Sequence, residues 1–332
     1  MATVFLQRLQ QQCKSTGTTV QYYLVKASLI LSLLIVIDDA IAQQRVVLIQ
    51  SSTESVYLQF AEAVRLQVNS LKIQTELHIV TADDFITNPS AIEIKADYFI
   101  AAGIRASQLL SDINSKKPQL MVLIPASFNE SHIKTNKTRC QPGICSVILL
   151  DQPIERQLHL LHLALPQHQR LLVINSPHTF PMTPQLSRIS HQLGLKIKYL
   201  KSISEESLIS QLTDELADND IVLALPDPSV YNRNTARPIL LATYKHGVPI
   251  FAYSQSFIDA GAALGVYTTP EQFALQSMEL IAEKQSQPGK PWPPNYQPKY
   301  YTIGINSAVV DSLGIRLPTT QSLRDQLERV QQ

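Results

Sequence analysis

The sequence predicts an α/β protein with two doubly wound, parallel-sheet lobes joined by a hinge that the chain crosses several times. From Arg45 onward, short apolar runs rich in β-branched residues alternate with amphipathic helical segments. This alternation is typical of parallel sheets with helices on both faces. The cycle breaks near Asp151 and then begins again, which predicts a second lobe rather than a longer sheet.

The composition excludes two broad classes. The hydrophobic fraction of 45% is too high for a disordered chain, and a net charge of +1 leaves no basic excess to neutralise nucleic-acid phosphates. The motifs of common nucleotide-binding enzymes, serine hydrolases and zinc proteases are missing. We therefore expect neither a cofactor nor a bound metal.

The N-terminal segment has the layout of a secretory signal. An unbroken apolar run spans 27–37, Lys26 precedes it, and the small-residue pattern Ala40-Ile41-Ala42 follows. The run is shorter than the roughly 20 residues that cross a bilayer. Residues 1–42 are thus predicted to be a signal peptide with an N-terminal extension, cleaved after Ala42. The alternative is an uncleaved signal that anchors the chain in the membrane.

Cleavage would leave two cysteines, Cys140 and Cys145, on either side of Gln-Pro-Gly-Ile. Pro and Gly favour a tight turn, and an exported protein favours the oxidised state. A disulfide is therefore the preferred interpretation. Two free thiols or a metal pair remain open, with His132 nearby as a further ligand.

The first lobe begins with a buried strand, followed by Ser51-Ser-Thr-Glu54, which has the form of a capping box and predicts a helix start. Gly103 closes the third strand and precedes another helix. Strands are expected at 46–49, 77–80, 98–102, 120–124 and 147–150.

Asp151-Gln152-Pro153 is the expected first crossover, and a helix from Ile154 to Leu165 follows it. Further strands are expected at 171–174, 197–200, 221–225, 248–252 and 264–267.

The segments after Thr268 contain both helix and strand patterns. Thr269–Gln272 is a capping box with Pro at the first helical position, and its helix is expected to run to about Lys284. Five prolines within 288–298 predict a stiff, extended surface segment. A strand at 301–305 follows, and Asn306 is expected to cap a short helix ending at Gly314.

The C-terminal third resembles the tryptophan/tyrosine-type ABC transporter substrate-binding proteins, which have a type I periplasmic-binding-protein fold. The resemblance rests on Leu225-Pro-Asp-Pro-Ser-Val-Tyr231, the segments 248–257, 260–263 and 266–271, and Asn306 with 313–318. The first loop departs from the family, because Ser51–Ser55 replaces the usual glycine-rich sequence. This departure leaves the ligand class open.

The resemblance implies a first lobe of 43–151 plus 269–298, a second lobe of 152–268 plus 299–318, and a C-terminal tail of 319–332. It implies a periplasmic, non-enzymatic protein that captures a small molecule, an amino acid among the candidates, in an interlobe cleft. Its partner would be an ABC permease in the inner membrane, and no nucleic acid is expected.

Candidate ligand-binding residues follow the strand ends, where helix N-termini supply N–H donors. Asp227 could pair with a ligand ammonium group, and Tyr231 could stack on the ligand. The same residues fit a plainer interpretation, because Ser and Asp cap helices and shape turns, and Tyr231 fits a core. The candidates are Ser51, Ser52, Ser55, Gly103, Ser127, Phe128, Ser176, Asp227, Ser229, Tyr231, Ser254 and Gln255.

Three rival functions are compatible with parts of the sequence. Glu155, His159 and His162 share one helix face and could bind zinc, although the opposite face is apolar, which makes them more simply a solvated side. A hydrolase could use Ser176 with His178, but two residues of separation suit a loop better than a catalytic pair. A periplasmic sensor that reports its ligand without transport is the third alternative.

Overall fold

The computed structural model describes residues 43–70, 75–113, 115–129, 141–201 and 204–331. The predicted signal peptide and Cys140 lie outside the described residues. The chain from Gln44 onward forms one compact unit. Among the described helices, none has the length and apolar character needed to cross a bilayer.

Lobe 1 is built on a six-stranded parallel sheet in the order β11-β5-β4-β3-β1-β2. Its strands are β1 (Gln44–Gln50), β2 (Thr75–Thr81), β3 (Tyr98–Ala102), β4 (Gln119–Ile124), β5 (Cys145–Leu149) and β11 (Asn295–Tyr296). Its helices are α3 (Ser55–Ser70), α4 (Ala82–Thr87), α5 (Pro89–Lys95), α6 (Ile104–Asp112), α7 (Ala126–Phe128) and α13 (Pro270–Ser286).

Lobe 2 is built on the sheet β12-β10-β9-β8-β6-β7, parallel except for the edge strand β12. Its strands are β6 (Arg170–Asn175), β7 (Lys196–Lys201), β8 (Ile221–Leu223), β9 (Ile250–Ala252), β10 (Leu264–Tyr267) and β12 (Thr302–Ile305). Its helices are α8 (Ile154–Ala164), η3 (Phe180–Met182), α9 (Thr183–Gln192), α10 (Glu205–Leu216), α11 (Ala236–Lys245), α12 (Gln255–Asp259), α14 (Ser307–Ser312) and α15 (Thr320–Val330).

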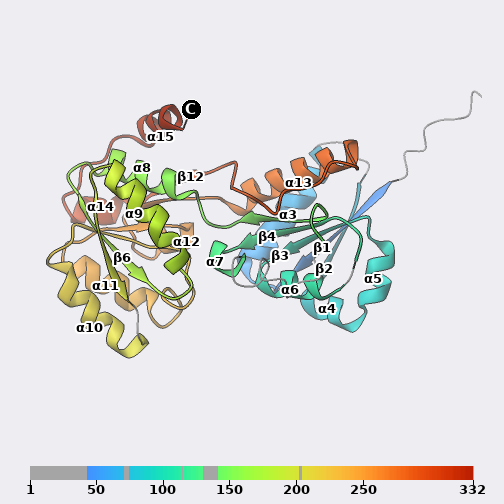
Figure 1. Cartoon of the computed structure of the whole chain (residues 1–332), viewed down its shortest axis with the longest axis horizontal. Coiled ribbons are helices and arrows are strands. Elements are labelled where there is room, and N and C mark those ends of the chain that lie inside the picture. The colour runs from blue at the N-terminus through green and yellow to red at the C-terminus, as the bar shows by residue number, and fades with distance from the viewer. Residues whose placement is uncertain (1–42, 71–74, 114, 130–140, 202–203, 332) are drawn as a thin grey trace, which may run out of the picture. The chain divides into compact units, whose positions relative to one another are not determined.

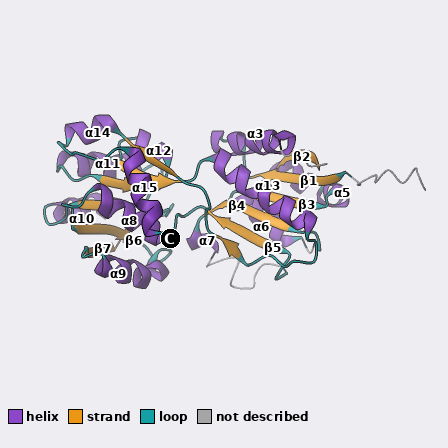
Figure 2. Cartoon of the chain, turned by 90° about the horizontal axis from the view of Figure 1, so that it is seen from above, coloured by secondary structure: helices purple, strands orange, loops and turns teal. Residues whose placement is uncertain are grey.

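Helices cover both faces of each sheet (Figures 1 and 2). In lobe 1, α3 and α13 pack on the face that carries Val46 and Leu48, while α4 and α6 pack on the face that carries Val47 and Ile49. Successive strand side chains point to opposite faces, so a strand covered on both sides must be apolar throughout. This explains why the strands are continuous apolar runs, and the predicted fold class is confirmed.

Two local predictions are confirmed at the helix starts. Thr269 caps α13 with both bonds of a capping box, to and from Gln272. Asn306 caps α14 by accepting the N–H of Val309 at 3.2 Å.

Two other local predictions are wrong. The capping box at Ser51–Glu54 is not formed, because α3 begins at Ser55 and the Ser51 hydroxyl instead accepts the N–H of Ala106 at 3.0 Å. The proline-rich stretch is not only a surface segment. Trp292 within it is buried, and β11 extends the edge of the lobe 1 sheet.

Residues near the C-terminus, predicted to be a tail, form the helix α15. In α15, Leu323 and Leu327 are fully buried in the same core as Leu158 and Leu161 of α8. The helix therefore adds to the apolar core of lobe 2.

Candidate functional site

The two sheets have the same strand order. In lobe 1, β2 lies on one side of β1 and β3 on the other, so the direction in which strands are added changes between β1 and β3. The same change occurs between β6 and β8 in lobe 2. Ligands of open α/β sheets bind beyond the carboxyl ends of the strands at such switch points, where the flanking loops diverge. The loops after these four strands carry Ser51, Gly103, Ser176 and Asp227. Four predicted site residues therefore belong to the two switch points.

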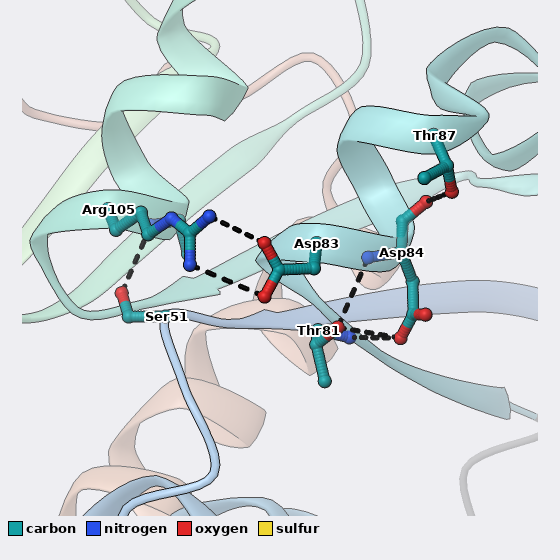
Figure 3. Close-up of polar contacts among 7 residues, drawn as sticks. Ser51, Thr81, Asp83, Asp84, Thr87 and Arg105 are labelled. Atoms are coloured by element: carbon teal, nitrogen blue, oxygen red, sulfur yellow. Dashed lines mark hydrogen bonds and ion pairs between the residues drawn. The ribbon is translucent and has the colours of Figure 1, made fainter.

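At the lobe 1 switch point the loops after β1 and β3 are in contact. Ser51 N–H donates to Ala102 O at 3.0 Å, and the Ser51 hydroxyl accepts the N–H of Ala106 (Figure 3). Gly103 has φ of 89°, and a Cβ there would lie 2.6 Å from both Ser51 Oγ and Tyr57 Oη. Only glycine fits this position, since the left-handed backbone and the covering phenol both exclude a side chain. Burial raises the pKa of Tyr57, and nearby Glu54 adds to that effect.

Neighbouring contacts hold the starts of α4 and α6 in place, as Figure 3 shows. Arg105 and Asp83 form an ion pair with Nη2 and Oδ1 2.6 Å apart. Thr81 and Asp84 cap α4 reciprocally, and the hydrogen bonds from Thr81 lower the pKa of Asp84. Both pairs are exposed, so they position the loops more than they stabilise the fold.

At the lobe 2 switch point a buried carboxylate joins the loops after β6 and β8. Asp227 has no exposed surface, and its Oδ2 accepts the Ser176 hydroxyl at 2.5 Å. Its Oδ1 accepts both the N–H and the hydroxyl of Ser229, at 3.0 and 2.6 Å, and Thr179 Oγ1 lies 3.4 Å from Oδ2. Asp227 thus connects the loops after β6 and β8 through buried hydrogen bonds.

The first crossover carries a second buried carboxylate. Asp151 is 4% exposed, and its Oδ2 accepts the N–H of Ala126, at the start of α7, at 2.6 Å. Burial raises the pKa of Asp151 to about 7, and the nearby charge of Asp227 acts in the same direction. Asp151 is at the crossover, as predicted from the sequence, but it was not among the predicted site residues.

Hydrogen bonds link the three chain crossovers to one another. Gln152 Nε2 donates to Thr268 Oγ1 at 2.5 Å, and Thr268 Oγ1 donates to Tyr300 O at 2.8 Å. Arg156 Nη1 donates to Gln152 Oε1 at 2.7 Å and to Pro298 O at 3.0 Å. We call residues 152, 156, 268 and 300 the hinge network.

Three aromatic side chains pack together near the lobe 2 switch point. Tyr231, Tyr253 and Phe257 pack together with ring centroids 5.4 to 6.1 Å apart. The Tyr231 hydroxyl is buried without a hydrogen-bond partner among the described residues. Burial raises the pKa of Tyr231 well above its usual value and that of Tyr253 to about 12, and nearby carboxylates act in the same direction on both.

Two cavities adjoin the crossovers, and predicted site residues line both. One of about 550 Å³ includes Ser55, Ser254, Gln255 and Tyr253, and the other of about 510 Å³ includes Ser127, Asp151 and His178. Leu123, in the first cavity wall, adopts φ of 61° at an irregularity in β4. A leucine in this region is strained, and such strain is concentrated at functional sites. The sequence offers no signal for it.

The remaining candidates have local roles. The Ser52 hydroxyl accepts the N–H of Glu54 at 3.3 Å, Phe128 packs against the lobe 1 core, and Ser254 caps α12. The roles of Ser52 and Ser254 match the plainer interpretation of serines as turn and cap residues. Whether they also contact a ligand stays a prediction.

The rival sites find less support. Within the described ranges, no group of three His, Cys, Asp or Glu residues is arranged to hold a metal ion. The Ser176 hydroxyl donates to Asp227 and accepts the N–H of His178, at 3.1 Å. Its proton is therefore directed at the carboxylate and not at the imidazole that a hydrolase would need.

Comparison with solved structures identifies the architecture. A substrate-binding protein with adhesive properties from Clostridium difficile, in its ligand-free open form, superposes with a TM-score of 0.67 at 12% identity, covering 84% of this chain and 97% of that one. The chain has the type I periplasmic-binding-protein fold.

Two further structures share this fold. An ABC domain in complex with L-Trp from Streptococcus pneumonia has a TM-score of 0.61 at 13% identity, covering 86% of this chain and 98% of that one. A periplasmic ribose ABC transporter protein from Conexibacter woesei has a TM-score of 0.53 at 10% identity, with 85% and 97% covered. No protein-family model and no curated protein sequence matches the chain.

Proposed function

We propose that this protein is an extracytoplasmic solute-binding protein that captures a small molecule between its two lobes and delivers it to an ABC permease. The observation that carries the proposal is the pair of equivalent switch points, each with hydrogen-bonded polar loops, on either side of a hinge crossed three times. The type I fold supports it, because the three superposed proteins include substrate-binding and ABC transporter components.

The proposal includes the lobe boundaries and the export of the chain. Lobe 1 comprises 43–151 and 269–298, and lobe 2 comprises 152–268 and 299–318, with α15 packed on lobe 2. The signal peptide over 1–42 would be removed on export. N-terminal sequencing of protein secreted by a bacterial host should then begin at or near Gln43, whereas intact Met1 in the cytosol would contradict export.

The proposed ligand contacts are the serines of the first loop and the residues that line the two cavities. In this arrangement Asp227 acts mainly by holding Ser176 and Ser229 in place. Closure of the lobes on the ligand would be driven by the difference in affinity between open and closed states.

The test is a thermal-shift screen of the mature protein against amino acids, sugars and polyamines, followed by calorimetric titration of each hit. A ligand that binds only the native state raises the melting temperature by mass action. Small-angle scattering with and without the hit should report a smaller radius of gyration when bound. No shift with any compound would count against solute capture.

Transport and sensing differ in the partner and not in the fold. Pull-down of the ligand-loaded protein from solubilised membranes, followed by mass spectrometry, separates them. Recovery of an ABC permease favours uptake, and recovery of a membrane receptor or kinase favours sensing.

A further inference from the structure

The third crossover leads directly into a buried aromatic ring that two arginines share. Tyr301, the residue before β12, is 8% exposed. The guanidinium carbons of Arg156 and Arg324 lie over its ring, 4.6 and 5.2 Å from the ring centroid. Arg156 belongs to the first turn of α8, which follows the first crossover, and Arg324 belongs to α15. One ring therefore connects the C-terminal helix with the helix that begins at the hinge.

Contact with the ring is what orients these side chains toward one another. Among the described residues, no Asp or Glu forms an ion pair with Arg156 or Arg324. Arg156 Nε and the Tyr301 hydroxyl are both buried, and neither has a hydrogen-bond partner in the part of the chain that the structure describes. A partly desolvated guanidinium over an aromatic face is a favourable arrangement that arginine adopts more readily than lysine.

Arg156 and Tyr301 also hold the crossovers through hydrogen bonds. Arg156 Nη1 donates to Gln152 Oε1 and to Pro298 O, which belong to the first and third crossovers. The main-chain oxygen of Tyr301 accepts Gln272 Nε2 at 3.2 Å, and Gln272 lies in the first turn of α13, a helix of lobe 1. Tyr301 thus contacts a helix of each lobe as well as the arginine of the hinge network.

The helix α15 has a fixed position on lobe 2. Its buried side chains Leu323 and Leu327 share one apolar core with Leu158 and Leu161 of α8, and α15 lies against α8 in both views (Figures 1 and 2). Arg324 directly follows Leu323, so burial of the leucine fixes the place from which the arginine reaches the Tyr301 ring.

We propose that α15 is a brace for the hinge. Through Arg324 and the Tyr301 ring it holds Arg156 against the first and third crossovers, and it thereby restrains opening of the crossovers in the unliganded protein. Two hydrogen bonds of the hinge network start from Arg156, so loss of the ring contact should loosen the crossovers and leave the sheets unchanged. The brace acts on the lobe motion that the proposed function requires, but it is measured without any ligand.

The experiment is hydrogen–deuterium exchange of the unliganded mature protein, followed by mass spectrometry of its peptides. Two N–H groups report on the crossovers: Thr269 N–H donates to Gln272 Oε1 at 3.0 Å, and Lys299 N–H donates to Gln276 Oε1 at 2.9 Å. The N–H groups of the central strand β1 report on global unfolding. Arg324→Met keeps the length of the side chain and removes its charge, and exchange in the crossover peptides should become about tenfold faster while exchange in β1 stays unchanged.

Matched variants separate the ring contact from other effects. Tyr301→Leu removes the ring and should reproduce Arg324→Met, whereas Tyr301→Phe keeps the ring and should exchange like the parent. Arg329→Met is the control within α15, because Arg329 Nε donates to Asp325 O of the same helix, and it should change nothing. If Tyr301→Leu does not fold, Arg324→Met carries the test, since Arg324 is only partly buried.

Three results would overturn the brace. They are parental exchange at the crossovers in Arg324→Met, an equal acceleration in β1, which indicates a general loss of stability, and an equal effect of Arg329→Met. A ligand screen without a hit would instead reject solute capture and leave these exchange rates as they are. The failure of the brace and the failure of the proposed function are therefore distinguishable.

Discussion

At the scale of single residues, Asp227 and Gly103 show why a site is harder to predict than a fold. Both lie in loops after strand ends, which the alternation of apolar runs locates well. The direction of a loop side chain depends on contacts far away in sequence, such as the bond from Ser176 to Asp227, 51 positions apart. No periodic signal in the sequence encodes such a contact.

For Asp227, the contacts favour a loop-organising role. Asp227→Ala would leave the Ser176 and Ser229 donors without their acceptor, and we expect the free energy of unfolding to fall by roughly 3 kcal/mol. Asp227→Asn, which keeps an acceptor for Ser229, should cost less. Denaturant unfolding measures both. If instead Asp227→Ala keeps its stability and loses affinity tenfold or more, the carboxylate contacts the ligand directly.

Gly103 gives a second residue-scale prediction. Gly103→Ala places a Cβ 2.6 Å from Ser51 Oγ and Tyr57 Oη in a left-handed backbone, and we expect a loss of about 1–3 kcal/mol of stability. Gly194→Ala is the matched control, because it also has positive φ, of 71°, but no neighbour within 4 Å of the added atom. Equal losses in the two variants would show that Tyr57 and Ser51 do not restrict Gly103.

At the scale of elements, buried strands and the capped starts of α13 and α14 were accessible from the sequence, whereas the start of α3 and the whole of α15 were not. The strands at 98–102 and 264–267 have the predicted bounds because continuous apolar runs mark strands buried on both faces. The capping box predicted at Ser51 is not formed, because the Ser51 hydroxyl accepts a hydrogen bond from the N–H of Ala106 in α6. A four-residue sequence pattern gives no information about such a distant donor. α15 was missed although Leu323 and Leu327 have helical spacing.

The predicted disulfide between Cys140 and Cys145 involves the turn before β5. Ile144 and Cys145 N–H both donate to Gln141 O, at 3.1 and 3.2 Å, so the chain turns directly before Cys145. A Cys140–Cys145 disulfide would close a short loop and should stabilise the exported protein by about 2 kcal/mol. Intact mass before and after reduction and alkylation measures it. Two thiols that alkylate freely in the native protein would contradict the bridge.

The hinge network carries another element-scale prediction. Thr268→Val keeps the shape of the side chain but leaves Gln152 without its acceptor and Tyr300 O without its donor. We expect a loss of about 1–3 kcal/mol and a broader distribution of lobe separations in small-angle scattering. Thr213→Val loses one hydrogen bond within α10 and should leave that distribution unchanged. Identical scattering from the two variants would show that the network does not restrain the hinge.

At the scale of the whole molecule, the buried acid at the crossover makes the stability of the protein depend on pH. The folded state raises the pKa of Asp151 to about 7 from an ordinary value of 3.8. The folded protein therefore binds a proton that the unfolded chain releases between about pH 4 and 7. The contribution of Asp151 to stability is highest below pH 4 and falls as pH rises to 7, by up to roughly 4 kcal/mol.

Other carboxyls oppose this trend only at lower pH. Hydrogen bonds from Arg170 lower the pKa of Asp220, and those from Lys299 and Tyr300 lower that of Glu279, against the effect of burial. Their contribution is present above their ordinary pKa values and is lost as pH falls through the lowered ones. Between pH 5 and 8, burial also lowers the pKa of His168, whose effect on stability opposes that of Asp151, so the contribution of Asp151 is isolated by comparing the parent with Asp151→Asn.

We expect Asp151→Asn to flatten the pH profile of the melting temperature between pH 5 and 8 and to melt higher than the parent at pH 8. The reason is that the amide keeps an acceptor for the Ala126 N–H and carries no charge to desolvate. Asp311→Asn should reproduce the parent profile. An unchanged slope in Asp151→Asn would mean that the carboxyl is not kept neutral by burial. A flattened slope, together with a higher melting temperature at pH 8, would show that the protein gives up stability at the crossover to keep this buried acid.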